Sequence, residues 1–187
     1  LLGGSKAADS VSISEYFLSK GVDYVLTGGV VANIFLIAAN VDIGKPSTKF
    51  IENNIPNHKE IIGKAKKLIK KHGEKIVYPT DVATNNEGKR MGIPIDQLPT
   101  KYPIHDIGLD TLVKYAELIE NAGTVIANGP MGVFEDSEFA IGTRVIFQAI
   151  ANNEGMTVVG GGETAMAFNQ MNLAKGIEHI STGGGSC

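Results

Sequence analysis

The sequence has little of what marks secreted, membrane-bound or nucleic-acid-binding proteins. It contains one cysteine, Cys187, so an intrachain disulfide is excluded and a reducing, cytoplasmic setting is expected. No apolar run approaches the roughly 20 residues that a membrane-spanning helix needs, and the first residues lack a secretory signal pattern. The net charge is −3, which favours neither nucleic acid nor an acidic membrane surface as a partner.

Tryptophan is absent, whereas glycine is abundant, with 23 of 187 residues where about 7% is usual. A hydrophobic fraction of 43% and a charged fraction of 20% are typical of a soluble globular protein. The chain begins without methionine and stops directly after a glycine-rich motif. We therefore expect residues 1–187 to be one domain of a longer protein, truncated at both ends.

Short β-branched runs alternate with longer amphipathic runs along the chain. Strands are expected at residues 24–29, 75–80, 124–130, 156–162 and 178–185. Helices are expected at residues 30–40, 58–73, 108–123, 138–155 and 163–171. Residues 80–107 contain turn formers and prolines, and we expect a long excursion with short strands there. The alternation predicts an α/β fold with a Rossmann-like parallel sheet and helices on both faces.

The glycines gather where the predicted strands end. They follow four strands, at residues 28–29, 129, 160–162 and 183–185, and a fifth set, residues 3–4, follows the first two leucines. In a parallel sheet these ends share one edge, where ligands of open α/β sheets bind. Glycine allows close backbone approach, and the helices that follow present free N–H groups, so we expect a phosphate-bearing ligand. The chain lacks both the P-loop pattern and G-x-G-x-x-G, which favours a nucleotide site of another design.

Several motifs carry a resemblance to a known family. "GGSKAAD" (3–9), "NGPMGVFE" (128–135), "FAIGT" (139–143), "GGGET" (160–164) and "STGGG" (181–185) occur in this order. Together they resemble the C-terminal, nucleotide-binding half of phosphoglycerate kinase, in an archaeal form. The resemblance implies one domain of a two-domain glycolytic kinase. It also implies Mg²⁺ and reversible phosphoryl transfer between 1,3-bisphosphoglycerate and ADP, giving 3-phosphoglycerate and ATP. The phosphoglycerate-binding half is absent, so this chain is expected to bind adenine nucleotide but to be nearly inactive.

The resemblance also assigns roles to individual residues. Lys6 is expected near the terminal phosphates, because phosphoryl transfer needs fixed positive charge around the migrating group. Ser10 departs from the family pattern, since many members have a second lysine there. Catalytic roles fall on Lys6, Gly161 and Gly184. Nucleotide binding falls on Gly4, Lys6, Gly28, Gly29, Asn128, Pro130, Gly132, Val133, Glu135, Gly160, Gly161, Gly162, Glu163 and Thr164. Val133 is expected to face the base and Phe134 the core.

Glu163 has two interpretations at this point. In the family the corresponding acid contacts the Mg²⁺ that accompanies the phosphates, and a cation between carboxylate and phosphate makes that arrangement favourable. Alternatively, the carboxylate only stabilises the start of its own helix. Two other functions stay open beside the kinase. One is a nicotinamide-dependent oxidoreductase domain, which the missing G-x-G-x-x-G disfavours, and the other is a non-catalytic interaction domain.

Overall fold

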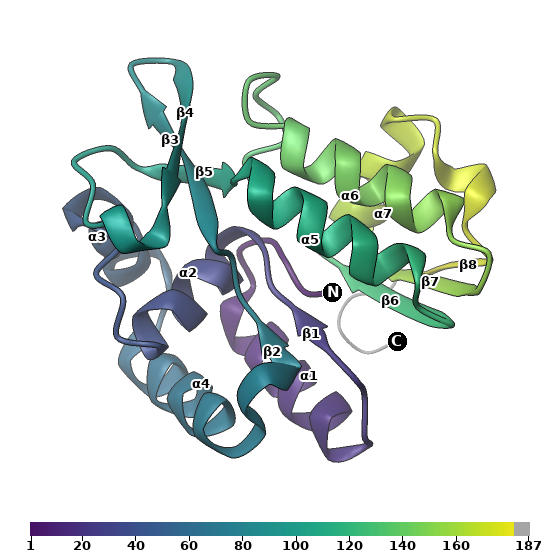
Figure 1. Ribbon diagram of the computed structural model, residues 1–187, viewed down its shortest axis with the longest axis horizontal. Coiled ribbons are helices and arrows are strands. Elements are labelled where there is room, and N and C mark those ends of the chain that lie inside the picture. Colours follow the sequence, from purple (N-terminus) through teal and green to yellow (C-terminus); the bar gives the residue numbers. More distant parts are fainter. Residues whose placement is uncertain (182–187) are drawn as a thin grey trace.

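The computed structural model describes residues 1–181, and its central element is a parallel sheet (Figure 1). β1 (Val25–Leu26) pairs with β2 (Ile76–Val77), and β6 (Thr124–Asn128), β7 (Met156–Gly160) and β8 (His179–Ser181) pair in that order. Leu2 makes parallel bridges to both Thr27 and Asn128. The first residues therefore join the two sets into one sheet, in the order β2, β1, residues 1–3, β6, β7, β8.

The order of the strands reverses beside the first residues. The chain runs outward from residues 1–3 through β1 to β2, and then returns to build β6, β7 and β8 on the other side. Such a reversal is the switch point of a doubly wound sheet, where a crevice opens at the carboxyl ends of the strands. Here the crevice lies between Gly3 and Gly129.

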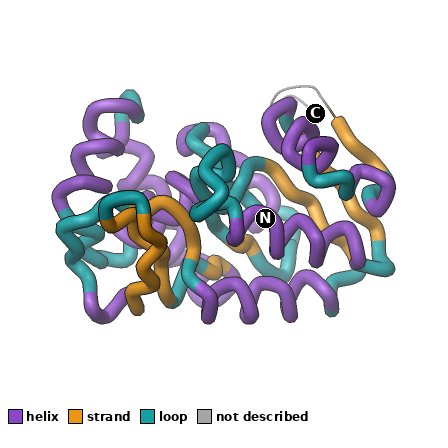
Figure 2. The backbone as a smooth tube through the Cα atoms, turned by 90° about the horizontal axis from the view of Figure 1, so that it is seen from above, coloured by secondary structure: helices purple, strands orange, loops and turns teal. Residues whose placement is uncertain are grey.

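Helices cover two faces of the sheet, as the views along two axes show (Figures 1 and 2). Neighbouring residues of one strand point to opposite faces, and the two core clusters follow this rule: Val25 and Ile76 belong to one, Leu26 and Val77 to the other. The first cluster is packed by α1 (Ala7–Ser19), α2 (Gly29–Ala38) and α4 (His58–His72). The second is packed by α5 (Leu109–Glu120), α6 (Ile141–Asn152) and α7 (Gly162–Gln170). The predicted α/β fold is confirmed.

The excursion is more regular than the sequence suggested. It forms a second, antiparallel sheet in the order β4–β3–β5, from β3 (Asp81–Asn86), β4 (Lys89–Pro94) and β5 (Ile104–Ile107). Glu87 and Gly88, between β3 and β4, both have positive φ, at 53° and 88°. Positive φ at both positions of a two-residue loop gives the hairpin turn that matches strand twist. The Asn85 side chain accepts the Gly88 amide at 2.7 Å and stabilises this turn.

The remaining elements are short or lie at the edge of the fold. α3 (Lys45–Asn54) packs beside the antiparallel sheet, where the Ser47 hydroxyl accepts the Ile104 amide at 2.9 Å. Single turns of 3-10 helix occur at Gly73–Lys75, Ile95–Gln97 and Ala174–Gly176. Over residues 1–181, every helix is too short or too polar to cross a bilayer.

Candidate functional site

A narrow cavity of about 30 Å³ lies at the switch point of the parallel sheet. Three glycine turns form its walls: residues 3–6 with the first turn of α1, residues 128–129 after β6, and residues 161–164 at the start of α7. Both α1 and α7 begin at the cavity. Their first N–H groups and the positive ends of their dipoles favour an anion there.

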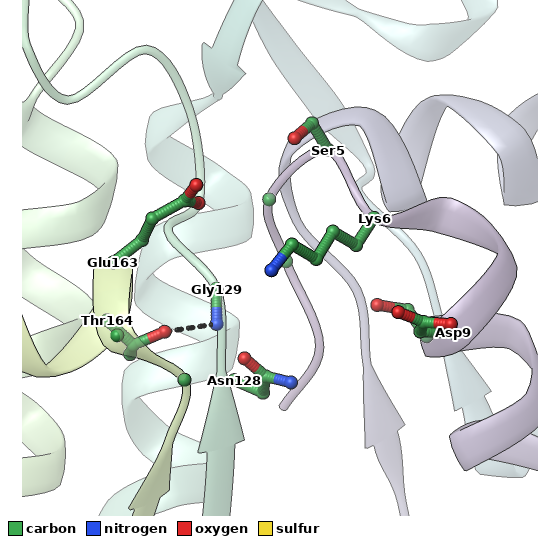
Figure 3. A pocket seen from close by; sticks show the side chains of 12 residues that line it. Ser5, Lys6, Asp9, Asn128, Gly129, Glu163 and Thr164 are labelled. Carbon is green, nitrogen blue, oxygen red and sulfur yellow. Dashed lines mark hydrogen bonds between the residues drawn. The ribbon is translucent and has the colours of Figure 1, made fainter. Parts of the chain in front are cut away.

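Glycine is required at two of these turns by positive φ and by the close approach of neighbouring atoms. Gly129 has φ of 88°, and a Cβ there would collide with the carbonyl oxygen of Gly3. Gly161 has φ of 93°, and its Cβ would lie 2.7 Å from Asn128 Oδ1. The Gly129 amide donates to Thr164 Oγ1 at 2.8 Å (Figure 3). The three turns are therefore held against one another before any ligand arrives.

Lys6 and Glu163 reach into the narrow cavity from opposite sides (Figure 3). Lys6 directly precedes α1, and within residues 1–181 its ammonium group forms no ion pair. Asp9, one turn further along α1, lines the same cavity. Ser10 also lines it and is buried, so the family's second lysine would have stood at this wall.

A second cavity of about 380 Å³ adjoins the narrow one, and Gly4, Ser5 and Glu163 line both. Its volume lies in the range of small-molecule binding sites. Most of its lining is apolar and comes from α3, from the antiparallel sheet and from residues 130–135. Phe50 on α3 stands 49% exposed at this cavity although it is a large aromatic side chain. The two cavities thus form one continuous site with a polar end and an apolar end.

Residues 130–135 form one wall of the larger cavity. Val133 is 39% exposed, whereas Phe134 packs partly against the second core cluster, although both line the cavity. The Val133 amide donates to the carbonyl of His105 at 2.8 Å, which fixes this wall to β5. Partial burial lowers the pKa of His105, and the nearby Asp136 carboxylate opposes that shift.

The structure brings most of the sequence-predicted site residues to these two cavities. Lining the narrow cavity are Gly4, Lys6, Asn128, Gly161, Gly162, Glu163 and Thr164. Lining the larger cavity are Gly29, Pro130, Gly132, Val133 and Glu135. Gly28 and Gly160 line neither, and Gly28 lies directly against the Met131 side chain. Gly184 lies outside the described residues.

Sequence reasoning missed Asp9, Phe50 and His105, which all line the site. Asp9 could have been found, because it lies three residues after Lys6 at the start of a helix, and residues three apart share a face. Phe50 lies on α3, and His105 lies on β5 in the excursion. No periodic pattern there indicated that these segments fold back onto the glycine edge.

Across residues 1–181, no group of three or more His, Cys, Asp or Glu side chains is placed to hold a metal ion. Mg²⁺ bound beside phosphate oxygens keeps several waters and usually takes only one or two protein carboxylates. Glu163 offers such a carboxylate at the junction of the two cavities. Among the described residues its carboxylate accepts no hydrogen bond from the start of its own helix, whose N-cap is Gly161.

The model of the phosphoglycerate kinase family matches residues 1–187. The chain belongs to this family. It is 47% identical over 188 residues to phosphoglycerate kinase of Methanothermus fervidus and 44% identical over 187 residues to that of Thermoplasma acidophilum. All of this chain is aligned, against 45% and 46% of the relatives. These relatives agree with the archaeal resemblance.

The family's solved structures have the same fold. The crystal structure of phosphoglycerate kinase from Pyrococcus horikoshii OT3 superposes with a TM-score of 0.87 at 38% identity, covering 98% of this chain and 46% of that one. The structure from Coxiella burnetii gives 0.85 at 34% identity. The chain therefore spans about half the length of the family members it matches. Membership favours the kinase among the three functions that the sequence left open.

Proposed function

We propose that residues 1–187 are the nucleotide-binding half of a phosphoglycerate kinase. The whole enzyme would transfer the terminal phosphoryl group of ATP to the carboxylate of 3-phosphoglycerate, and the reverse, in the cytoplasm. The observation that carries the proposal is the continuous pair of cavities at the switch point. One end offers a lysine and two helix N-termini, and the other is apolar and large enough for a nucleoside.

The phosphates occupy the narrow cavity in this proposal. Lys6 supplies positive charge to the migrating group, whose oxygens carry negative charge in the transition state. The turn at Gly161 contributes backbone N–H groups, and the resemblance gives Gly184 the same role. Mg²⁺, when bound, supplies further positive charge to the phosphate oxygens. Glu163 would hold it, with Asp9 on the facing wall of the narrow cavity.

The nucleoside occupies the larger cavity. Val133 and Phe50 present apolar surface to the base, and Glu135 lies within reach of a ribose hydroxyl at the same cavity. The acceptor binds to the half of the enzyme that this chain lacks. Without that half the acceptor is not held beside the phosphate, so the chain alone binds nucleotide with almost no turnover.

Calorimetric titration of the chain with MgADP tests this proposal. We expect one saturable site, and phosphoryl transfer only after the phosphoglycerate-binding half of a relative is added. A folded chain that gives no heat with MgADP would contradict the proposal. Tight binding of NADH, with none of ADP, would revive the oxidoreductase alternative.

A further inference from the structure

A buried ion pair lies at the wall of the larger cavity, where Asp106 is one of the lining residues. Arg90 Nη1 on β4 donates to Asp106 Oδ2 on β5 at 2.7 Å, and the two side chains are 12% and 0% exposed. The other ion pair found within residues 1–181, Lys64–Glu60, is exposed on α4. Exposed pairs contribute little to folding, whereas removing one partner of a buried pair is strongly destabilising, because the other charge is left buried and unpaired.

Asp106 joins the antiparallel sheet to the start of α6. Its Oδ2 accepts the Gly142 amide at 2.7 Å and its Oδ1 accepts the Ile107 amide at 2.9 Å. Arg90 Nη2 donates to the Ile107 carbonyl at 2.7 Å. Burial raises the pKa of Asp106, and the hydrogen bonds from Arg90 and the two amides oppose that shift. The hydrogen bonds from these three partners therefore favour the charged form of the carboxylate, against the effect of burial.

Residues 131–133, in the wall of the larger cavity, pack against Asp106 of this pair. A Cβ at Gly132 would collide with the His105 carbonyl and lie 2.6 Å from Asp106 Oδ1, and one at Gly142 would collide with the same oxygen. The Met131 amide donates to Thr143 Oγ1 on α6 at 3.0 Å. Residues 131–133 are thus held between β5 and the start of α6, the two segments that Asp106 connects.

We propose that Arg90 and Asp106 are positioning residues for nucleoside binding. They fix residues 131–135 at the distance from α3 that the nucleoside requires, while the phosphate end is set independently by the turns at Gly3, Gly129 and Gly161. This inference rests on the proposed function, because it assigns the nucleoside to the larger cavity. Asp106 lines this cavity, but its side chain is fully buried and Arg90 is not among the lining residues, so the role assigned to the pair is positioning.

The double variant Arg90→Met/Asp106→Leu tests the proposal by separating stability from binding. Replacing a buried ion pair with apolar residues of similar volume is often neutral or stabilising, whereas removing one partner alone leaves the other charge buried and unpaired. The amides of Gly142 and Ile107 lose their acceptor, and Gly132 loses its support. We expect the affinity for MgADP to fall about 10-fold and the affinity for inorganic tripolyphosphate to change less than about twofold.

Matched variants distinguish positioning from general loosening. Ile61→Val and Leu68→Ala remove buried methyl groups from α4, which lines neither cavity. They lower the free energy of unfolding but should leave the affinity for MgADP unchanged at temperatures where each variant is folded. Arg90→Lys keeps a positive charge beside Asp106 but lacks the planar fork that donates both to Asp106 Oδ2 and to the Ile107 carbonyl. It should also weaken MgADP selectively, which keeps the proposal testable if the double variant does not fold.

Two results would overturn the inference. One is a double variant that is folded and binds MgADP as the wild type does. The other is an equal loss of affinity for MgADP and for tripolyphosphate, which would indicate a loosened fold and no specific role in positioning. If the wild-type chain itself binds tripolyphosphate but not ADP, the proposed function fails at its nucleoside end and this inference fails with it.

Discussion

The two cavities are neighbours, yet they are built in different ways. The narrow one is made from backbone turns of the parallel sheet, one lysine and two helix starts, and its geometry leaves no room for larger residues at Gly129 or Gly161. The larger one is lined by residues of α2, α3, the antiparallel sheet and residues 130–135. The first offers an anion backbone N–H groups and one lysine, whereas the second offers a surface made largely of apolar side chains. Substitutions at the two ends should therefore weaken the binding of different parts of one ligand.

The largest effect is expected from Lys6→Met, at the charged end. Hydrogen bonds to charged groups contribute about 1.5–3 kcal/mol, so the affinities for MgADP and tripolyphosphate should both fall roughly 10- to 100-fold. Lys6 is exposed, so thermal stability should not change. Lys67→Met, on the exposed face of α4, is the matched control. Calorimetry of both ligands checks the prediction, and a loss confined to MgADP would place Lys6 at the wrong end.

Phe50→Ala should weaken ligand binding at the apolar end alone. Stacking of a base on an aromatic ring contributes about 1–3 kcal/mol, so MgADP affinity should fall roughly 10-fold or more while tripolyphosphate binding stays the same. Val113→Ala, at a 70% exposed position that lines neither cavity, is the control. Because the chain has no tryptophan, Phe50→Trp also gives a single fluorescent reporter whose emission should change with ADP but not with tripolyphosphate.

Glu163→Gln should have a smaller effect whose sign depends on Mg²⁺. With the metal present, loss of the carboxylate should weaken ADP binding several-fold. Without it, removal of a negative charge beside the phosphates should strengthen binding. Titrations with and without Mg²⁺ check this, with the exposed Glu154→Gln as control. An effect of one sign in both conditions would favour the alternative in which Glu163 only stabilises the start of α7.

The smallest effect is expected from His105→Gln, a change in the lining of the larger cavity. The folded pKa of His105 lies below the usual 6.5, so the unfolded chain binds the proton more readily. The free energy of unfolding should therefore fall as the pH drops below about 6.5, and His105→Gln should reduce this dependence. An NMR titration of the ring should give a midpoint below 6.5 that moves when ADP binds. A midpoint above 6.5 would mean that Asp136 outweighs burial.

The sequence predicted the parallel half of the fold well because its signals are local. Helix α4 agrees with the expected range at both ends to within one residue, since apolar residues and lysines alternate in step with the helix and Gly73 closes it. Helix α1 was missed because its buried face includes Ser10 and Ser14, and these polar residues interrupt the helical spacing of apolar residues. The larger cavity could not be predicted in full. It forms only when α3 and β5 meet residues 130–135, and such contacts between distant segments leave no periodic pattern.

The central claim is that one nucleotide spans both cavities, and amide chemical-shift mapping tests it most directly. With MgADP, we expect shifts both at residues 3–6 and 161–164 and at Phe50, His105 and residues 131–135. With tripolyphosphate, only the first set should move. If MgADP perturbs one set and leaves the other unchanged, the two cavities do not form one nucleotide site and the account is wrong.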